Sequence, residues 1–144
     1  MFRKSTAVWS GGGKEGRGQL TSTSGVLQDT PYSFSSRFEN EEGRAGTNPE
    51  ELIAAAHAGC FSMALSFELG AAGFNPEELR TEAAVQIEKA AEGFEIRSVH
   101  LKLEGRVPGI SAEQFEQLAQ SAKQNCPVSK ALGAIGITLQ AKLA

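Results

Sequence analysis

The sequence predicts an α+β fold, and three patterns support that prediction. Segments near residues 5–10, 18–24 and 31–38 read as short strands, the last of them alternating aromatic and polar side chains. A long apolar helix follows from about residue 49, and two strand segments, an amphipathic helix, a short helix and a final strand complete the chain. The length of 144 residues predicts a single domain spanning residues 1–144.

The N-terminal strands are separated by turn signals. The glycines at positions 11–13 make a turn between residues 5–10 and residues 18–24, which we expect to pair as a hairpin. We expect residues 31–38 to form a third strand, with Arg37 lying on it between apolar neighbours. Residues 39–46 are charged and end at a glycine, which predicts an exposed connection.

The long helix has the clearest start signal in the chain. Asn48 is a favourable N-cap, Pro49 suits the first helical position, and Glu51 can complete a capping box. About 22 residues would give a helix of roughly 33 Å, longer than the radius of gyration of about 14–15 Å expected for this domain. Because its middle has no charged face, the helix must be buried all round, and we infer a dimer whose second copy covers one side.

The elements of the second half of the chain are predicted from the spacing of apolar residues and from residues typical of turns and helix ends. Residues 80–90 and 94–107 alternate apolar and polar positions around a turn at Gly93, which predicts a hairpin. An amphipathic helix opens at Ser111, and Cys126 followed by Pro127 marks the start of a short helix that ends near Leu132. Residues 134–143 are expected to form the last strand.

Composition excludes several classes of protein. The net charge is −3, with 14 basic and 17 acidic residues, so no large basic surface for nucleic acid is expected. The glycines at positions 11–13 interrupt any apolar signal core. The longest apolar run, residues 52–67, is shorter than the roughly 20 residues of a membrane-spanning helix. These features predict a soluble, cytoplasmic protein.

The two cysteines, Cys60 and Cys126, are either small core residues or functional thiols. Cys60 lies in the apolar middle of the long helix, where burial should raise its pKa and leave it inert unless a cation is near. Arg37 is the strongest candidate for that cation, although it could equally be a solvated charge at a strand edge. Lys14 and Arg17, in the glycine-rich turn, are weaker candidates.

A buried arginine needs a carboxylate partner, and the helix start offers Glu50 and Glu51. Glu51 is explained by the capping box and points away from the Cys60 side of the helix, so Glu50 is the better candidate. A first-turn acid that favours the helix dipole remains the alternative explanation of Glu50.

Cys126 has a different environment, because a thiolate at a helix N-cap is stabilised by the helix dipole and free amides. Two such thiols suggest a cycle in which one is oxidised to a sulfenic acid and the other resolves it as a disulfide. His57 is either a packed core histidine or an activating base. A zinc site built from His57 and both cysteines would lack a fourth ligand.

These motifs resemble a known family. Residues 47–52 (TNPEEL), residues 56–65 (AHAGCFSMAL) and residues 125–129 (NCPVS) are similar to the signatures of the OsmC/Ohr family of bacterial thiol peroxidases acting on organic hydroperoxides. The resemblance covers residues 9–143, and residues 31–39 resemble the OsmC branch more than the Ohr branch.

The resemblance implies antiparallel sheets around a central buried helix, in an intertwined homodimer with two sites at its interface. Cys60 would be the peroxidatic cysteine, Cys126 the resolving cysteine, and Glu50 the residue that orients an activating arginine. In the Ohr branch that arginine comes from the glycine-rich turn, where this chain has Lys14, whereas the OsmC branch points to Arg37. No bound cofactor is expected, and an external dithiol, such as a lipoylated protein, would act as reductant.

The apolar side chains of Phe34, Phe38, Phe61 and Met63 would favour organic hydroperoxides over hydrogen peroxide. Two other functions stay open at the level of sequence. One is a non-catalytic dimer that binds a lipid or another small molecule, and the other is a thioesterase-like enzyme that holds an acyl chain along the apolar helix.

Overall fold

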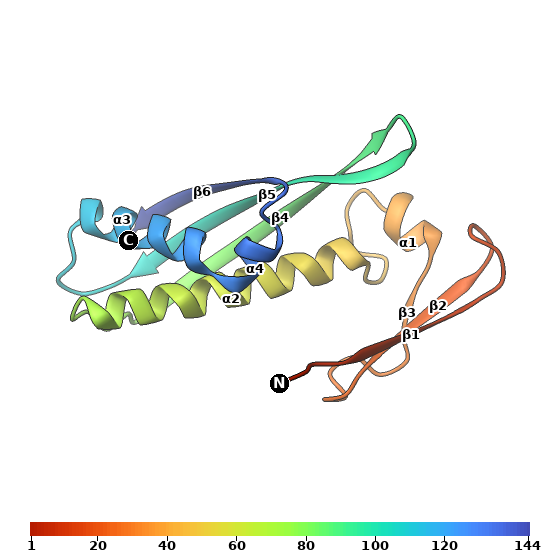
Figure 1. Cartoon of the computed structure of the whole chain (residues 1–144), viewed down its shortest axis with the longest axis horizontal. Coiled ribbons are helices and arrows are strands. Elements are labelled where there is room, and N and C mark those ends of the chain that lie inside the picture. Colours follow the sequence, from red (N-terminus) through yellow and green to blue (C-terminus); the bar gives the residue numbers. More distant parts are fainter. The chain divides into compact units, whose positions relative to one another are not determined.

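The computed structural model describes residues 1–144 and confirms the α+β class (Figure 1). The chain folds into two compact units, Met1–Leu52 and Ile53–Ala144. The boundary between them falls within the first turn of the long helix α2 (Pro49–Ala71). The expectation of a single domain stays a prediction.

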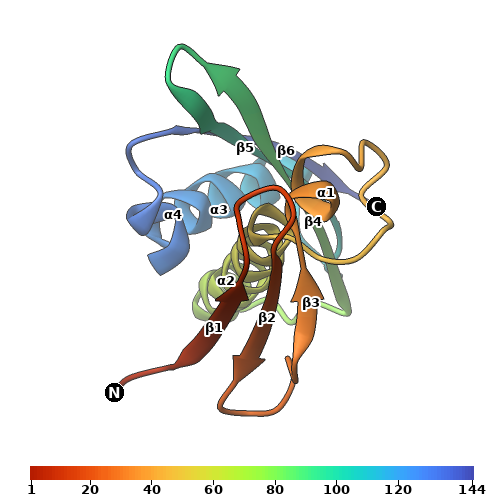
Figure 2. The same cartoon turned by 90° about the vertical axis from the view of Figure 1, so that its right-hand side faces the viewer.

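The N-terminal unit contains a three-stranded antiparallel sheet of β1 (Ser5–Ser10), β2 (Arg17–Ser22) and β3 (Thr30–Tyr32), in that order (Figure 2). The hairpin expected from the glycine-rich turn is confirmed. Gly18 pairs with Trp9 on one side and with Tyr32 on the other. A Cβ atom at position 18 would lie 2.3 Å from the Tyr32 ring and 2.8 Å from the Trp9 ring, so only glycine fits between them.

The third strand ends earlier than its sequence pattern predicts, which corrects the expectation for residues 31–38. After Tyr32 the chain forms a short helix, α1 (Phe34–Phe38). The cause is a reciprocal cap in which the Ser36 backbone N–H donates to Ser33 Oγ and the Ser33 N–H donates to Ser36 Oγ. Arg37 therefore lies on a helix and not on a strand.

The start of α2 has the predicted N-cap and first-turn proline, but the Glu51 carboxylate binds Thr47 in place of the predicted capping-box contact. The Glu51 backbone N–H donates to Asn48 Oδ1 at 2.8 Å, as an N-cap requires, and Pro49 is the first helical residue. The Glu51 carboxylate accepts a hydrogen bond from the Thr47 hydroxyl at 2.9 Å, so its side chain is engaged one residue before the N-cap.

The C-terminal unit contains a second three-stranded sheet, in the order β4 (Glu78–Ala90), β5 (Gly93–Arg106) and β6 (Gly136–Leu143). β4 and β5 form the expected antiparallel hairpin, but β6 runs parallel to β5, which corrects the expectation of purely antiparallel sheets. The chain crosses between β5 and β6 through α3 (Ala112–Asn125) and α4 (Pro127–Ala131), and a helical crossover of this kind is what joins parallel strands.

Helices α2, α3 and α4 lie on one face of this sheet (Figures 1 and 2). The hydrophobic core lies between the sheet and the helices. It takes one row of α2, the inward residues of β5 and one face of α3: Phe61, Leu65 and Leu69; Val99, Leu101 and Leu103; Phe115, Ala119 and Ala122. This packing fixes the middle of α2 against the segment that joins α3 to α4.

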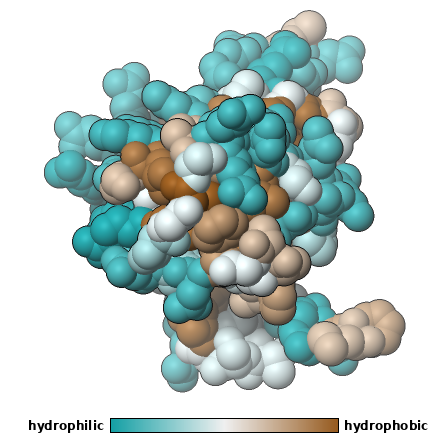
Figure 3. Space-filling view, turned by 90° about the vertical axis from the view of Figure 1, so that its left-hand side faces the viewer, coloured by the Kyte–Doolittle hydropathy of each residue, from teal (hydrophilic) through white to brown (hydrophobic).

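The rest of α2 is poorly covered within one chain. Only 22% of the most apolar 18-residue stretch of α2 is buried, and Met63 and Phe67 are 64% and 73% exposed. Figure 3, which faces the C-terminal end of α2, shows hydrophobic side chains at the surface with hydrophilic ones around them. By length and composition this 23-residue helix could span a membrane, so the argument from the shorter apolar run in the sequence does not exclude a membrane span. Core helices of soluble proteins meet the same two criteria.

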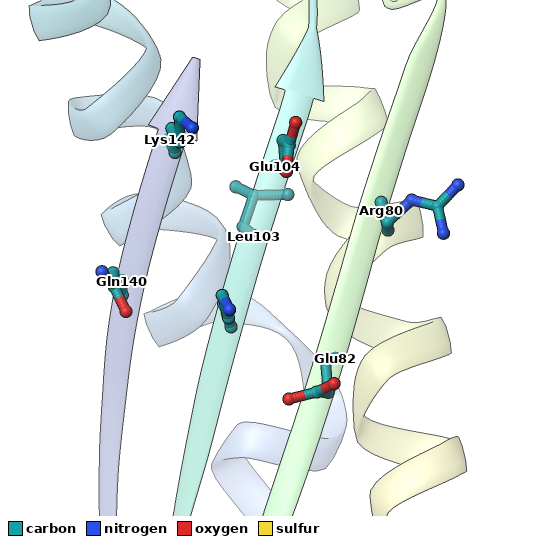
Figure 4. Close-up of a pocket in the computed structure, with 7 residues that line it drawn as sticks. Arg80, Glu82, Leu103, Glu104, Gln140 and Lys142 are labelled. Atoms are coloured by element: carbon teal, nitrogen blue, oxygen red, sulfur yellow. The ribbon is translucent and has the colours of Figure 1, made fainter. Parts of the chain in front are cut away.

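The opposite face of the second sheet is polar. Its shallow hollow of about 190 Å³ is lined mainly by charged side chains (Figure 4): Arg80, Glu82, Lys102, Leu103, Glu104, Gln140 and Lys142. Strand register places Arg80 opposite Glu104 and Glu82 opposite Lys102, so opposite charges face one another across the strands. Neither cysteine lines this hollow, and the face serves as the hydrated side of the sheet.

Candidate functional site: a pair of thiols

The structure brings Cys60 and Cys126 together although 66 residues separate them. Their Sγ atoms lie 2.9 Å apart, within hydrogen-bond distance, and both are free thiols. Cys60 comes from the middle of α2 and is partly exposed, whereas Cys126 is fully buried at the junction of α3 and α4. The Cys60 thiol is therefore accessible to solvent, and the Cys126 thiol lies beside it in the protein interior.

The two thiols have pKa values shifted in opposite directions. Burial raises the pKa of Cys60, and its hydrogen bond with Cys126 raises it further, against a smaller lowering effect of the Val128 N–H. Burial also acts to raise the pKa of Cys126, but hydrogen bonds from Cys60, from the Ser129 backbone and hydroxyl, and from the Val128 N–H outweigh it. The pKa of Cys126 is therefore lowered, and Cys60 needs a further cation before it becomes the thiolate.

His57 lies three residues before Cys60 and is completely buried. Its Nε2 atom is 2.7 Å from the hydroxyl of Ser129, which is also buried, and its Nδ1 atom has no hydrogen-bond partner. Burial lowers the pKa of His57, so the ring is neutral at pH 7. From the sequence alone, His57 is either a core residue or a base, and Ser129 is not distinguished from other serines. Ser129 is the third residue of α4, the helix whose N-cap residue is Cys126.

The zinc arrangement weighed from the sequence does not form. No group of three or more His, Cys, Asp or Glu side chains is placed to hold a metal ion.

A second group of candidate site residues lies in the N-terminal unit. Arg37 Nε donates to both carboxylate oxygens of Glu50, at 3.1 and 3.2 Å, and Arg37 Nη2 donates to Oε1 at 2.7 Å. The Glu50 side chain is only 7% exposed and that of Arg37 is 35% exposed. The carboxylate is thus held by three charge-assisted hydrogen bonds in a largely dry setting, which is the strong form of this interaction.

The other cations of this unit are placed differently. Lys14 Nζ lies 5.6 Å from the centre of the Phe34 ring, and Arg17 lies at the start of β2. The Arg37 guanidinium stacks over Phe38 at 4.8 Å and is the cation that pairs with a buried carboxylate.

A small cavity of about 120 Å³ adjoins Arg37. Its lining is mostly aromatic: Trp9, Gly13, Tyr32, Ser33, Phe34, Arg37 and Phe38. Of the apolar walls suggested by the sequence, Phe34 and Phe38 line this cavity. Phe61 does not face solvent, because it is fully buried in the core of the C-terminal unit.

Comparison with known proteins identifies the family. Residues 40–142 match the family of OsmC-like proteins. The chain belongs to the OsmC/Ohr family. It is 51% identical to peroxiredoxin OsmC of Escherichia coli over 143 residues, covering 99% of this chain and 97% of that protein. It is 33% identical to the organic hydroperoxide resistance protein OhrA of Bacillus subtilis, covering 90% of this chain and 89% of that protein.

Solved structures agree with the fold. The crystal structure of OhrB of Bacillus subtilis superposes with a TM-score of 0.71 at 28% identity, covering 96% of this chain and 98% of that one. An organic hydroperoxide resistance protein from Elizabethkingia anophelis gives a TM-score of 0.73 at 27% identity, covering 100% and 99%. The OsmC-like fold expected from the sequence motifs is thus confirmed.

Proposed function

We propose that this protein is a thiol-dependent peroxidase that reduces organic hydroperoxides to alcohols, with Cys60 as the nucleophile and Cys126 as the resolving thiol. The observation that carries the proposal is the 2.9 Å separation of the two free thiols, one partly exposed and one buried. Relatives named as a peroxiredoxin and as an organic hydroperoxide resistance protein support the same class of reaction.

The chemistry proceeds in three steps. The Cys60 thiolate attacks one peroxide oxygen, so that an S–O bond forms, the O–O bond breaks and the alkoxide leaves as the alcohol with one proton. Cys126 then attacks the Cys60 sulfenic acid, which forms the S–S bond and releases water made from the sulfenic hydroxyl and the Cys126 proton. An external dithiol restores both thiols by exchange and is itself oxidised to a disulfide.

Arg37 supplies the positive charge that the Cys60 thiolate needs. Burial raises the pKa of Cys60, and a positive charge beside a thiol favours its thiolate form. Glu50 holds the guanidinium in one orientation through three hydrogen bonds, which a solvated arginine would not have. Glu50 is a positioning residue in this scheme and does not touch the peroxide.

A homodimer completes the site. The exposed apolar face of α2, including Met63 and Phe67, would be costly to leave in water, and a second copy of the chain would bury it. In an intertwined dimer, the two copies of the chain would form two sites at their interface. The protein would then work in the cytoplasm without a bound cofactor, and would draw electrons from a dithiol such as a lipoylated protein.

Substrate preference follows from the aromatic cavity beside Arg37. Its lining by Trp9, Tyr32, Phe34 and Phe38 can hold the organic group of a hydroperoxide, whereas hydrogen peroxide gains nothing from it. We therefore expect a higher kcat/KM for cumene hydroperoxide than for hydrogen peroxide, measured with dihydrolipoamide as reductant. Equal values would contradict the assignment of this cavity to the substrate.

The same assay separates this function from the two alternatives. Cys60→Ser should abolish peroxide consumption, and Cys126→Ser should stop multiple turnover with the dithiol. A thioesterase-like enzyme would not depend on Cys126, and a lipid-binding dimer would consume no peroxide at all. Dithiol-dependent turnover unaffected by Cys126→Ser would count against the two-cysteine cycle.

A further inference from the structure

We propose that the hydrogen bond between His57 and Ser129 is a latch that keeps Cys126 aligned with Cys60 while Cys60 is a sulfenic acid. The inference rests on the proposed two-cysteine cycle and adds to it two residues that have no place in the three steps above. Both are positioning residues, because they act through the helical turns that carry the cysteines. The starting observation is a buried histidine in α2 whose partner lies 72 residues away in α4.

Two side-chain contacts join α2 to residues 126–129. Cys60 Sγ lies 2.9 Å from Cys126 Sγ, and His57 Nε2 lies 2.7 Å from Ser129 Oγ. His57 precedes Cys60 by three residues, and Ser129 follows Cys126 by three residues, a spacing that puts side chains on one face of a helix. The two contacts are therefore neighbouring links between the same two helical turns.

The first turn of α4 fixes Cys126 relative to Ser129. The Lys130 backbone N–H donates to the Cys126 carbonyl at 3.0 Å, which closes this turn. The helix has only five residues and no side-chain cap, and a helix this short depends on tertiary contacts. Val128 packs against the core, but hydrophobic burial is non-directional, whereas a hydrogen bond requires a defined distance and angle. The contact with His57 therefore sets how this turn is oriented against α2.

The latch lies in the protein interior. His57 is fully buried and Ser129 is 6% exposed, so water does not compete for the hydrogen bond. The other ring nitrogen of His57, Nδ1, has no partner, so the contact with Ser129 is the hydrogen bond that orients the ring. A histidine that only filled space in the core would not need a buried hydroxyl at 2.7 Å.

The latch acts in the intermediate between the two chemical steps. Oxidation puts a hydroxyl group on the Cys60 sulfur, which changes the contact between the two sulfur atoms. The His57–Ser129 hydrogen bond contains neither sulfur, so the oxidation leaves it intact and the two helical turns stay aligned.

Cys126 then attacks the Cys60 sulfur. The S–S bond forms, the S–O bond breaks, and the hydroxyl leaves as water with the Cys126 proton. The sulfur atoms are 2.9 Å apart in the reduced protein and must reach about 2.05 Å, a shift of less than about 1 Å. Because a misplacement of about 1 Å can slow a reaction by about 100-fold, a latch that preserves this alignment matters for the resolving step.

Single-turnover mass spectrometry tests the inference. Reduced full-length protein is mixed with one equivalent of cumene hydroperoxide and quenched in acid. The intact masses of the sulfenic form (a gain of about 16) and of the disulfide (a loss of about two) are followed in time. In His57→Leu and in Ser129→Ala, we expect the sulfenic form to appear as fast as in the wild type. We expect the disulfide to form roughly tenfold or more slowly, because the two turns are no longer held in alignment.

Excess cumene hydroperoxide gives a second readout. A sulfenic acid that is not resolved reacts with another hydroperoxide molecule, which yields a sulfinic acid on Cys60 (a gain of about 32) and a second alcohol. We expect this mass to accumulate in His57→Leu and in Ser129→Ala, whereas the wild type should form the disulfide first. Loss of stability alone would not favour the sulfinic acid over the disulfide in the folded protein.

Two further variants separate the latch from simple packing. His57→Gln offers both an amide N–H and a carbonyl oxygen near the position of Nε2, so it should restore most of the rate of disulfide formation that His57→Leu loses. Thr81→Val is the matched control, because Ser62 of α2 donates to the Thr81 hydroxyl of β4 at the same distance of 2.7 Å. Its loss removes a comparable hydrogen bond of α2 away from α4 and should leave the rate of disulfide formation unchanged.

The outcomes distinguish the two proposals. If the wild type forms no disulfide, the two-cysteine cycle itself fails. If the wild type forms the disulfide and Ser129→Ala forms it just as fast, the cycle stands and the latch is overturned; this variant removes a single oxygen atom and decides the matter even if His57→Leu does not fold. The latch is also overturned if His57→Gln is as slow as His57→Leu, or if Thr81→Val is as slow as Ser129→Ala.

Discussion

The Arg37–Glu50 pair offers the sharpest test of the proposed activation of Cys60, through the substitution Glu50→Gln. This change keeps the shape of the side chain and one carbonyl oxygen but removes the negative charge and one acceptor for Arg37. Glu51→Gln is its matched control, since it changes the neighbouring residue in the same helical turn, where the exposed carboxylate accepts only from Thr47.

The size of the effect can be worked from the contacts. Hydrogen bonds to charged groups contribute about 1.5–3 kcal/mol each, and Glu50 accepts three of them while being 7% exposed. The amide keeps one acceptor, and water reaches the Arg37 side chain, which is 35% exposed. We therefore expect Glu50→Gln to lower the free energy of unfolding by about 1–2 kcal/mol, or roughly 3–8 °C in Tm. Glu51→Gln should stay within about 0.5 kcal/mol.

The assay has two parts. Urea unfolding gives the stability, and it is run at one fixed protein concentration because the stability of the proposed dimer would depend on concentration. Stopped-flow oxidation of Cys60 by cumene hydroperoxide at pH 7 gives the rate, which should fall roughly tenfold in Glu50→Gln, because an arginine that is no longer held in one orientation stabilises the Cys60 thiolate less. If Glu50→Gln and Glu51→Gln behave alike in both measurements, the activation scheme is refuted.

The packing and the titrating groups lead to three further predictions. Gly105→Ala should cost about 1–3 kcal/mol in urea unfolding, since its Cβ would lie 2.5 Å from the Phe115 ring; an unchanged midpoint would contradict that packing. Cys126→Ala should make Cys60 alkylate faster with iodoacetamide at pH 7, because the hydrogen bond and charge of Cys126 raise the Cys60 pKa; slower alkylation would reverse the assigned direction. The free energy of unfolding of the wild type should fall as the pH drops below about 6.5. Burial lowers the pKa of His57, so in this pH range the unfolded chain binds a proton that the folded chain does not. His57→Gln should reduce this dependence of stability on pH; an unchanged dependence would contradict the assignment to His57.

Much of the fold could be predicted because its elements carry strong local signals. The Asn48-Pro49 start of α2 and the alternation along β4 and β5 each depend on residues close in sequence, and the structure confirms them. The α1 helix could not be read from alternation, because a spacing of four between Phe34 and Phe38 suits both a strand and a helical turn. Ser33 and Ser36 held the missed signal, a reciprocal serine cap.

The parallel pairing of β6 was missed for another reason. The two helices predicted between residues 94–107 and 134–143 were compatible with a crossover to a parallel strand, but the partner and register of β6 are set by tertiary packing and not by a local pattern.

The site was predictable in its residue types and less so in its contacts. The apolar helix and the N-cap position suggested opposite pKa shifts for Cys60 and Cys126, and the structure has those directions. The preference for Glu50 over Glu51 as the partner of Arg37 came from helix geometry, and the ion pair is present. The contact of His57 with Ser129 spans 72 residues, and no spacing rule could have found it.

The most direct test of the two-cysteine cycle is the intact mass of the fully reduced protein after one equivalent of tert-butyl hydroperoxide, with Cys60→Ser and Cys126→Ser measured alongside. The cycle predicts a loss of about two mass units in the wild type, no change in Cys60→Ser, and a gain of about 16 in Cys126→Ser. An unchanged wild-type mass would contradict the cycle and would leave both thiols as core residues.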